Sequence, residues 1–160
     1  MDTPVTGSHE HGIDHVVYGP GSAWSQFDLG TDFDAGTLSV IAELDPQGTQ
    51  GVVRQVLAMF RESLEPTLQL FEQLRASHSI DGLRFQAHKL YSAAGQVGAL
   101  RLAQACRQIS AYFAAPDRRD VERVDDPVSR AELEALLDDL EHEIVRVQRR
   151  LRAMLDEDAG

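Results

Sequence analysis

The sequence is short of several residue types, and each shortage excludes a class of protein. Its 160 residues include a single cysteine, Cys106, so a disulfide framework within the chain is excluded and a reducing compartment is expected. No apolar run approaches the ~20 residues that a membrane-spanning helix needs. The first residues have neither the basic nor the apolar region of a signal peptide. We therefore expect a cytoplasmic protein that makes no contact with membranes.

Basic residues are also scarce. The chain has 15 lysine and arginine residues against 26 aspartate and glutamate residues, which gives a net charge of -11 at pH 7. Nucleic acids and anionic membranes both attract proteins with a basic surface, so we expect neither as a partner. Aromatic residues make up only 6% of the chain, while hydrophobic residues make up 42%. Aliphatic side chains must therefore fill the core of the single domain that a chain of this length suggests.

Glycine and proline are concentrated at the start of the chain. They interrupt any periodic pattern over residues 1–30. The residues concerned are Pro4, Gly7, Gly12, Gly19, Pro20, Gly21 and Gly30. We predict a flexible, poorly ordered tail over 1–30 and one helical domain over 31–158.

Apolar residues recur at helical spacing in four segments, and no segment alternates as a β-strand does. The spacing predicts helices near 34–44, 50–77, 81–114 and 128–156. Pro66 removes a backbone donor and crowds the preceding turn, so we expect a kink or break in the second helix. Helices with one apolar stripe each bury those stripes together most simply in a bundle. The predicted fold is all-α, an antiparallel up-and-down four-helix bundle with a short N-terminal helix.

Two of the predicted helices begin with recognisable start signals. Asp34 is a suitable N-cap for the first helix, because its carboxylate can accept a hydrogen bond from an N–H of the first turn. The last helix is expected to open with Pro127 and a capping box in which Ser129 is the cap and Glu132 its partner.

One histidine of the third predicted helix stands beside a run of small residues. On a helical wheel of about 100° per residue, Ala87 and Leu90 face the core and His88 lies on the shoulder of the buried stripe. Ser92 and Gly95 fall within about 40° of His88, one and two turns further along. The wheel therefore predicts a partly exposed imidazole with a shallow surface beside it, over which a partner could approach.

Small residues also have a simpler explanation, because they allow helices to pack closely. Ala94, Gly98 and Ala99 fit that interpretation. Ser92 and Gly95 lie away from the centre of the stripe and fit it less well. A histidine in a helix is more often structural than reactive, so the spacing by itself does not decide between the two roles.

The segment "AHKLYSAAGQVGALRLAQACRQI", residues 87–109, resembles the signature of histidine-containing phosphotransfer (HPt) domains. The pattern matches at eleven positions: Ala87, His88, Leu90, Ala93, Ala94, Val97, Gly98, Ala99, Leu102, Cys106 and Ile109. The order of the predicted helices over 34–157 is also similar to that of the family. The resemblance implies a helical bundle in which His88 accepts a phosphoryl group.

The sequence departs from the family pattern at two positions near the histidine. Tyr91 stands where the family has a lysine, and Ser92 stands where it has a glycine. The resemblance implies that residues at these positions support the phosphoryl group or the docked partner. We therefore take Tyr91, Ser92 and Gly95 as supporting residues, with Arg84 and Lys89, the single lysine of the chain, as nearby sources of positive charge.

The function that the resemblance implies is that of a phosphocarrier and not of an enzyme. A receiver domain of a hybrid histidine kinase or response regulator would pass its aspartyl phosphate to His88, and another receiver would take it in a phosphorelay. The receiver would also supply Mg²⁺, and no cofactor of the chain's own is expected. Neither G-x-x-x-x-G-K-[ST] nor G-x-G-x-x-G occurs, so kinase activity is not expected.

The sequence leaves two other interpretations open. A helical interaction module that docks receivers or kinases without carrying phosphate is the alternative function, although such a module has no need of His88. His9, His11 and His15 with Glu10 have the side chains for a metal site. In a glycine-rich tail we interpret them as solvated, and we predict no metal site.

Overall fold

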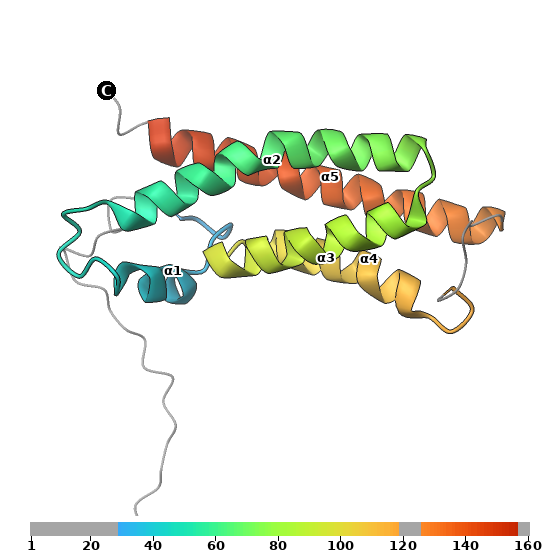
Figure 1. Ribbon diagram of the computed structural model, residues 1–160, viewed down its shortest axis with the longest axis horizontal. Helices are drawn as coiled ribbons and strands as arrows, with labels where there is room; N and C mark the ends of the chain where they lie inside the picture. Colours follow the sequence, from blue (N-terminus) through green and yellow to red (C-terminus); the bar gives the residue numbers. More distant parts are fainter. Residues whose placement is uncertain (1–28, 119–125, 157–160) are drawn as a thin grey trace, which may run out of the picture.

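The computed structural model describes residues 29–118 and 126–156. Within these ranges the chain is all-helical, as the sequence predicts, and has no strand. Figure 1 shows the helices, which are α1 (Ala35–Ala42), α2 (Val52–Ala76), α3 (Ile80–Val97), α4 (Leu100–Ala114) and α5 (Pro127–Asp156). The predicted tail falls outside the described residues except for its last two positions.

The four longer helices form a closed ring around one core. Each packs against the next in the chain, α2 on α3, α3 on α4 and α4 on α5, and α2 packs on α5 to close the ring. Figure 1 shows that the chain reverses direction from each of these helices to the next. The short helix α1 contacts α2 and α3 at one end of the bundle. Helices α3 and α5 therefore lie on opposite sides of the core.

The core is built from the apolar stripes that the spacing predicts. The largest fully buried side chains are all apolar, and most are aliphatic, as the small aromatic content requires. They are Phe71, Leu38, Leu57, Leu64, Leu102, Ile109, Leu137, Leu140, Ile144, Leu151, Val53 and Cys106. Helices α1, α2, α4 and α5 contribute these side chains, and α3 adds the smaller, fully buried Ala87 and Ala94, so no described helix stands apart from the core.

The predicted third helix, 81–114, is wrong in one respect, because the structure divides it into α3 and α4. Gly98 ends α3 in the left-handed conformation, with φ of 77°. Its N–H and that of Ala99 donate to carbonyls of the last turn of α3, which closes that helix. The chain then turns back, and α4 packs along α3. The apolar stripe is buried on both sides of the break, so its periodicity concealed the reversal.

The segment before α1 holds this turn in place. The backbone N–H of Asp34 donates to the carbonyl oxygen of Gly98 at 2.8 Å. The carboxylate of Asp34 also accepts from the N–H of Thr37 at 2.8 Å and from its hydroxyl at 2.7 Å, which confirms Asp34 as the N-cap. A Cβ on Gly98 would lie 3.0 Å from the Asp34 carbonyl oxygen. Both the positive φ and the close approach require glycine at this position.

The start of α5 differs from the predicted capping box. The helix does begin at Pro127, but the carboxylate of Asp126 accepts from the N–H of Ser129 at 2.9 Å. Ser129 is thus already inside the helix, and the prediction that it caps α5 is wrong. Asp126 takes that role because it stands just before the proline that starts the helical turn.

Helix α2 passes through Pro66 without a break. The hydroxyl of Thr67 donates to the carbonyl oxygen of Ser63 at 2.7 Å, and the hydroxyl of Ser63 donates to that of Phe60 at 2.7 Å. Side chains thereby supply hydrogen bonds on either side of the position where the proline has no N–H. Figure 1 shows the axis of α2 bending part-way along its length.

A buried carboxylate ties the segment before α1 to the last helix. Asp32 is only 5% exposed and accepts from Arg146 at 2.7 Å and from Arg150 at 2.9 Å. Burial alone would raise the pKa of Asp32, but the hydrogen bonds and positive charges of the two arginines outweigh it and lower that pKa. The ionised carboxylate therefore stabilises the docking of this segment on α5.

Among the helices of the described ranges, none combines the length and the apolar character that crossing a bilayer requires.

Candidate functional site

His88 lies on the outer surface of α3, near the middle of the helix. The residues that the wheel assigns to the core, Ala87 and Leu90, are buried, while His88 itself is exposed. Within the described part of the chain, the imidazole takes part in no hydrogen bond or ion pair. Both ring nitrogens are consequently free to meet a partner, and the predicted exposure of the histidine is confirmed.

The surface next to His88 is low, as the wheel predicts. Ser92 and Gly95 are both exposed. The hydroxyl of Ser92 donates to the carbonyl oxygen of His88 at 3.3 Å, so it is directed back onto its own helix. A Cβ built on Gly95 would meet nothing within 4 Å. Packing within the described domain therefore does not require the glycine, which leaves open space beside the imidazole.

Arg84, one turn before His88, is held by the end of α4 and the turn that follows it. Its guanidinium donates to the carbonyl oxygen of Arg118 at 2.6 Å and lies 5.0 Å from the centre of the Phe113 ring. The same group is 3.7 Å from the carboxylate of Asp81. These contacts direct the charge of Arg84 toward the α3–α4 interface, where it fastens the histidine-bearing part of α3 to α4.

Lys89 lies on the other flank of His88 and borders an open groove between α2 and α3. The groove has a volume of about 350 Å³, and Pro66, Leu70 and Gln86 also line it. Lys89 is exposed and forms no ion pair with any described residue. Of the two nearby cations expected from the sequence, Lys89 is the one whose charge is not already engaged.

Two aromatic side chains stand on either side of the imidazole. Tyr91, one turn after His88, is 42% exposed, and Phe85, one turn before it, is 65% exposed. Phe85 was missed by the sequence reasoning, although the wheel puts it about 60° from His88, on the flank opposite Tyr91. Aromatic side chains are enriched on surfaces that a protein partner covers, and the exposed Phe85 lies next to the histidine of the family signature.

The comparison with known protein families shows the family of the chain. Residues 55–143, more than half of the chain, match the Hpt domain family. This chain belongs to the Hpt domain family. Hpt domains serve in phosphotransfer in two-component signalling, where they interact with receiver domains and histidine kinases. They are phosphocarrier modules and not kinases. No curated protein matches the chain significantly.

The matched segment contains His88 and all of α3 and α4, together with most of α2 and the first half of α5. Cys106, which lies in the family signature, is fully buried in α4, and burial raises its thiol pKa to about 12. A buried thiol that remains protonated is unreactive, so Cys106 acts as a small core residue of the Hpt domain.

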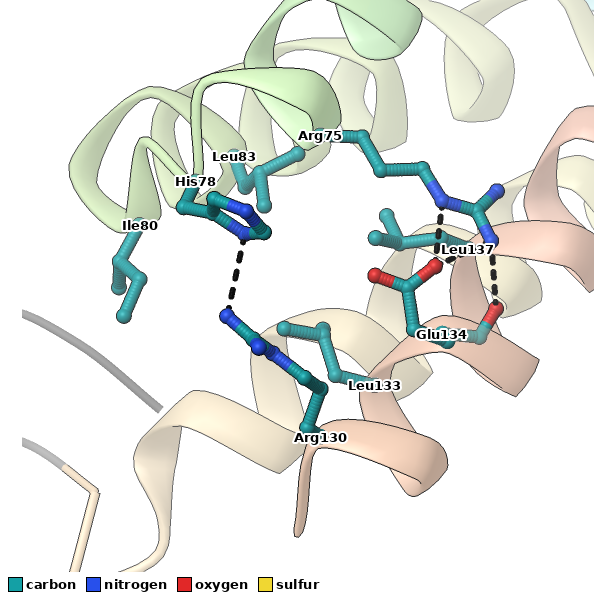
Figure 2. Close-up of a pocket in the computed structure, with 8 residues that line it drawn as sticks. All are labelled: Arg75, His78, Ile80, Leu83, Arg130, Leu133, Glu134 and Leu137. Carbon is teal, nitrogen blue, oxygen red and sulfur yellow. Dashed lines mark hydrogen bonds and ion pairs between the residues drawn. The ribbon is translucent and has the colours of Figure 1, made fainter. Parts of the chain in front are cut away.

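A second histidine, His78, lies in the turn between α2 and α3, as Figure 2 shows. Its Nδ1 is 3.3 Å from the guanidinium of Arg130, beside a cavity of about 30 Å³. Arg75 borders the same cavity and is bound to Glu134, and also to Asp138 at 2.7 Å. Small-molecule sites usually measure about 300–1,000 Å³, so this cavity is too small to be one.

Within the described ranges, no group of three or more histidine, cysteine, aspartate or glutamate side chains is arranged to hold a metal ion. The histidines considered for such a site, His9, His11 and His15, lie outside those ranges, as does Glu10.

Proposed function

We propose that this Hpt domain carries a phosphoryl group on His88 between receiver domains in a two-component phosphorelay. The donor would be the aspartyl phosphate of a hybrid kinase or response regulator, and a second receiver would be the acceptor. The observation that carries the proposal is the open space beside an exposed, unpartnered imidazole. A glycine without a packing role and a histidine without a hydrogen bond among the described residues are both explained if a partner approaches there.

The chemistry needs little from the chain beyond position and access. The lone pair of Nε2 attacks the phosphorus in line with the aspartyl oxygen, the bond between that oxygen and phosphorus breaks, and aspartate leaves as a carboxylate. The ring proton is carried on Nδ1. Transfer to the next receiver is the same step in reverse. The receiver supplies Mg²⁺ and the charges that stabilise the transferring group, so the chain needs no cofactor of its own.

The supporting residues have four different roles under this proposal. Ser92 and Gly95 keep the approach to Nε2 low, while Phe85 and Tyr91 contact the apolar rim of the receiver. Lys89 provides the nearest uncommitted positive charge, in place of the family lysine that Tyr91 replaces. Arg84 acts indirectly, because its contacts with α4 fix the orientation of the helical turn that carries His88. Such transfer between receivers would take place in the cytoplasm.

The test is phosphate transfer from a receiver. The purified chain is mixed with receiver domains from the same cell that carry labelled aspartyl phosphate, and the label on the chain is measured. We expect wild type to be labelled and His88→Gln to remain unlabelled. Glutamine is a helix former of similar length but has no nucleophilic nitrogen, so folding should be unaffected. The phosphate should be lost in acid and retained in base, as expected of a phosphoramidate.

His142→Gln is the matched control, because His142 is an exposed histidine on α5 and the substitution is identical. It should be labelled like wild type. Full labelling of His88→Gln would assign the phosphate to another residue. Receiver binding without labelling of wild type would instead favour the alternative, an interaction module that carries no phosphate.

A further inference from the structure

The outward face of α5 is divided into an acidic half and a basic half. Between residues 132 and 143 the helix carries six acidic residues, and between 146 and 152 it carries four arginines with no acidic residue among them. The two sets are Glu132, Glu134, Asp138, Asp139, Glu141 and Glu143, followed by Arg146, Arg149, Arg150 and Arg152. So sharp a division is unexpected in a chain whose basic residues are scarce.

Contacts within the bundle account for only part of these charges. Arg75 of α2 forms ion pairs with three of the acidic residues, Glu134, Asp138 and Glu141. Asp32 forms ion pairs with Arg146 and Arg150. Asp139 in the acidic half and Arg149 and Arg152 in the basic half are exposed and form no ion pair within the described ranges. Charges of both signs are thus left over on one helix face, at a separation that prevents them from pairing with each other.

Most side chains along the midline of this face are small. On the wheel, the direction opposite the buried stripe of α5 is occupied by His142, with Ala131, Ala135 and Ala153 within about 20° of it. All four are exposed. Alanine at three of these positions lets another helix approach closely, toward the ~8–10 Å between axes that is usual for packed helices. The face combines a midline of mostly small side chains with acidic residues on one side of His142 and arginines on the other.

We propose that this face binds a second copy of the chain, with α5 of one copy packed antiparallel on α5 of the other. A two-fold axis near His142 superposes the acidic half of each helix on the basic half of its mate. Asp139 of one copy then faces Arg149 of the other, two residues left unpaired within the described ranges, and the symmetry repeats the pair. A parallel arrangement would instead set like charges against each other, so the charge pattern selects the antiparallel one.

The position of α5 makes this dimer compatible with phosphotransfer. Helices α3 and α5 lie on opposite sides of the core, and no Cα atoms of their described residues come within 8 Å of each other. Pairing through α5 therefore leaves both copies of His88 on the two outer faces of the dimer, where each can meet a receiver. The proposal does not depend on the phosphocarrier function, and either one can fail without the other.

The experiment is sedimentation equilibrium of the full chain in ~20 mM and ~1 M salt. At low salt, as the concentration is raised to several hundred micromolar, we expect a mass twice the 17.7 kDa of the monomer, and at high salt the monomer mass, because exposed ion pairs are screened. Arg149→Asp and Asp139→Arg should each give monomers at low salt. The double variant, with both charges exchanged, should dimerise again.

Arg107→Asp is the control, since Arg107 is exposed on α4, away from α5's outer face, and undergoes the same charge change. It should dimerise like wild type, and circular dichroism should show that every variant is folded. A wild-type chain that is monomeric at low salt and several hundred micromolar would overturn the proposal. So would dimers that survive both single substitutions, or a double variant that remains monomeric.

Discussion

Gly95 and Gly98 lie three residues apart and are glycines for opposite reasons. Gly98 has a positive φ, its carbonyl oxygen binds the N–H of Asp34, and an added Cβ would meet the Asp34 backbone at 3.0 Å. Gly95 is an ordinary helical residue, and an added Cβ would meet nothing within 4 Å. The junction at Gly98 is closed by contacts within the chain, whereas the surface at Gly95 is open to whatever approaches His88.

The difference shows which features serve the fold and which do not. Glycine in a helix interior costs up to ~1 kcal/mol relative to alanine. At Gly98 the conformational freedom of glycine is needed, because no other residue suits the positive φ of the turn and its close contact with Asp34. At Gly95 no contact in the described domain offsets the cost, and the residue is explained by access to the neighbouring imidazole. Substitutions of the two glycines and of residues near them test this contrast.

The largest effect is expected from Gly98→Val. A β-branched residue in the left-handed region costs about 1–2 kcal/mol, and displacing the Asp34 backbone adds to it, so we expect the free energy of unfolding to fall by at least ~3 kcal/mol. Urea denaturation followed by circular dichroism measures the change. Gly95→Val is the matched control and should lose less than ~1 kcal/mol. Equal losses in the two variants would remove the distinction between the two glycines.

The junction also depends on the charge of Asp32. Asp32→Asn leaves Arg146 and Arg150 without their buried carboxylate, and we expect a loss of ~1–3 kcal/mol at pH 7. Because the pKa of Asp32 is lowered in the folded protein, its stabilisation is present above the ordinary carboxyl pKa, near 4, and disappears as the pH falls through the folded value.

The free energies of unfolding of wild type and Asp32→Asn should therefore converge when measured at successively lower pH, starting below about pH 4. A gap between the two that stays constant from pH 7 to pH 2 would mean that the stabilisation comes from shape and not from ionisation.

At the open surface beside His88, Gly95→Leu should impair phosphoryl transfer without unfolding the domain. The leucine would stand between His88 and the partner's aspartate, so we expect the transfer rate from a phosphorylated receiver to fall at least about tenfold, or ~1.4 kcal/mol. The free energy of unfolding should not fall, because leucine is a better helix former than glycine. Ser92→Phe should act in the same direction. Unchanged rates in both variants would place docking on another face.

The smallest effect is expected from Gly95→Ala. Alanine removes the conformational freedom of glycine and meets no neighbour, so the domain should gain ~0.5–1 kcal/mol in thermal or urea unfolding. A single methyl group should change transfer far less than leucine does. A loss of stability here would reveal a contact that the helix geometry does not predict.

The predictions from sequence were most successful where the signal is local. Asp34 is the N-cap, α5 starts at Pro127, and His88 lies exposed beside a buried stripe, because caps and helical periodicity depend on residues within one or two turns. The predicted cap at Ser129 failed for a local reason as well, since Asp126 stands nearer to the first helical residue. The helical wheel that placed Ser92 and Gly95 beside His88 could have placed Phe85 there as well.

The sequence by itself determined that the chain is helical, which side of each helix is buried, and which histidine lies next to a cleared surface. Only the tertiary structure decided that the predicted third helix is two helices. Gly98 is compatible with a helix and with a turn, and the apolar stripe continues across it apart from the five-residue step from Val97 to Leu102. The turn is held by Asp34, 64 residues earlier in the chain, and a contact over that distance leaves no trace in local periodicity.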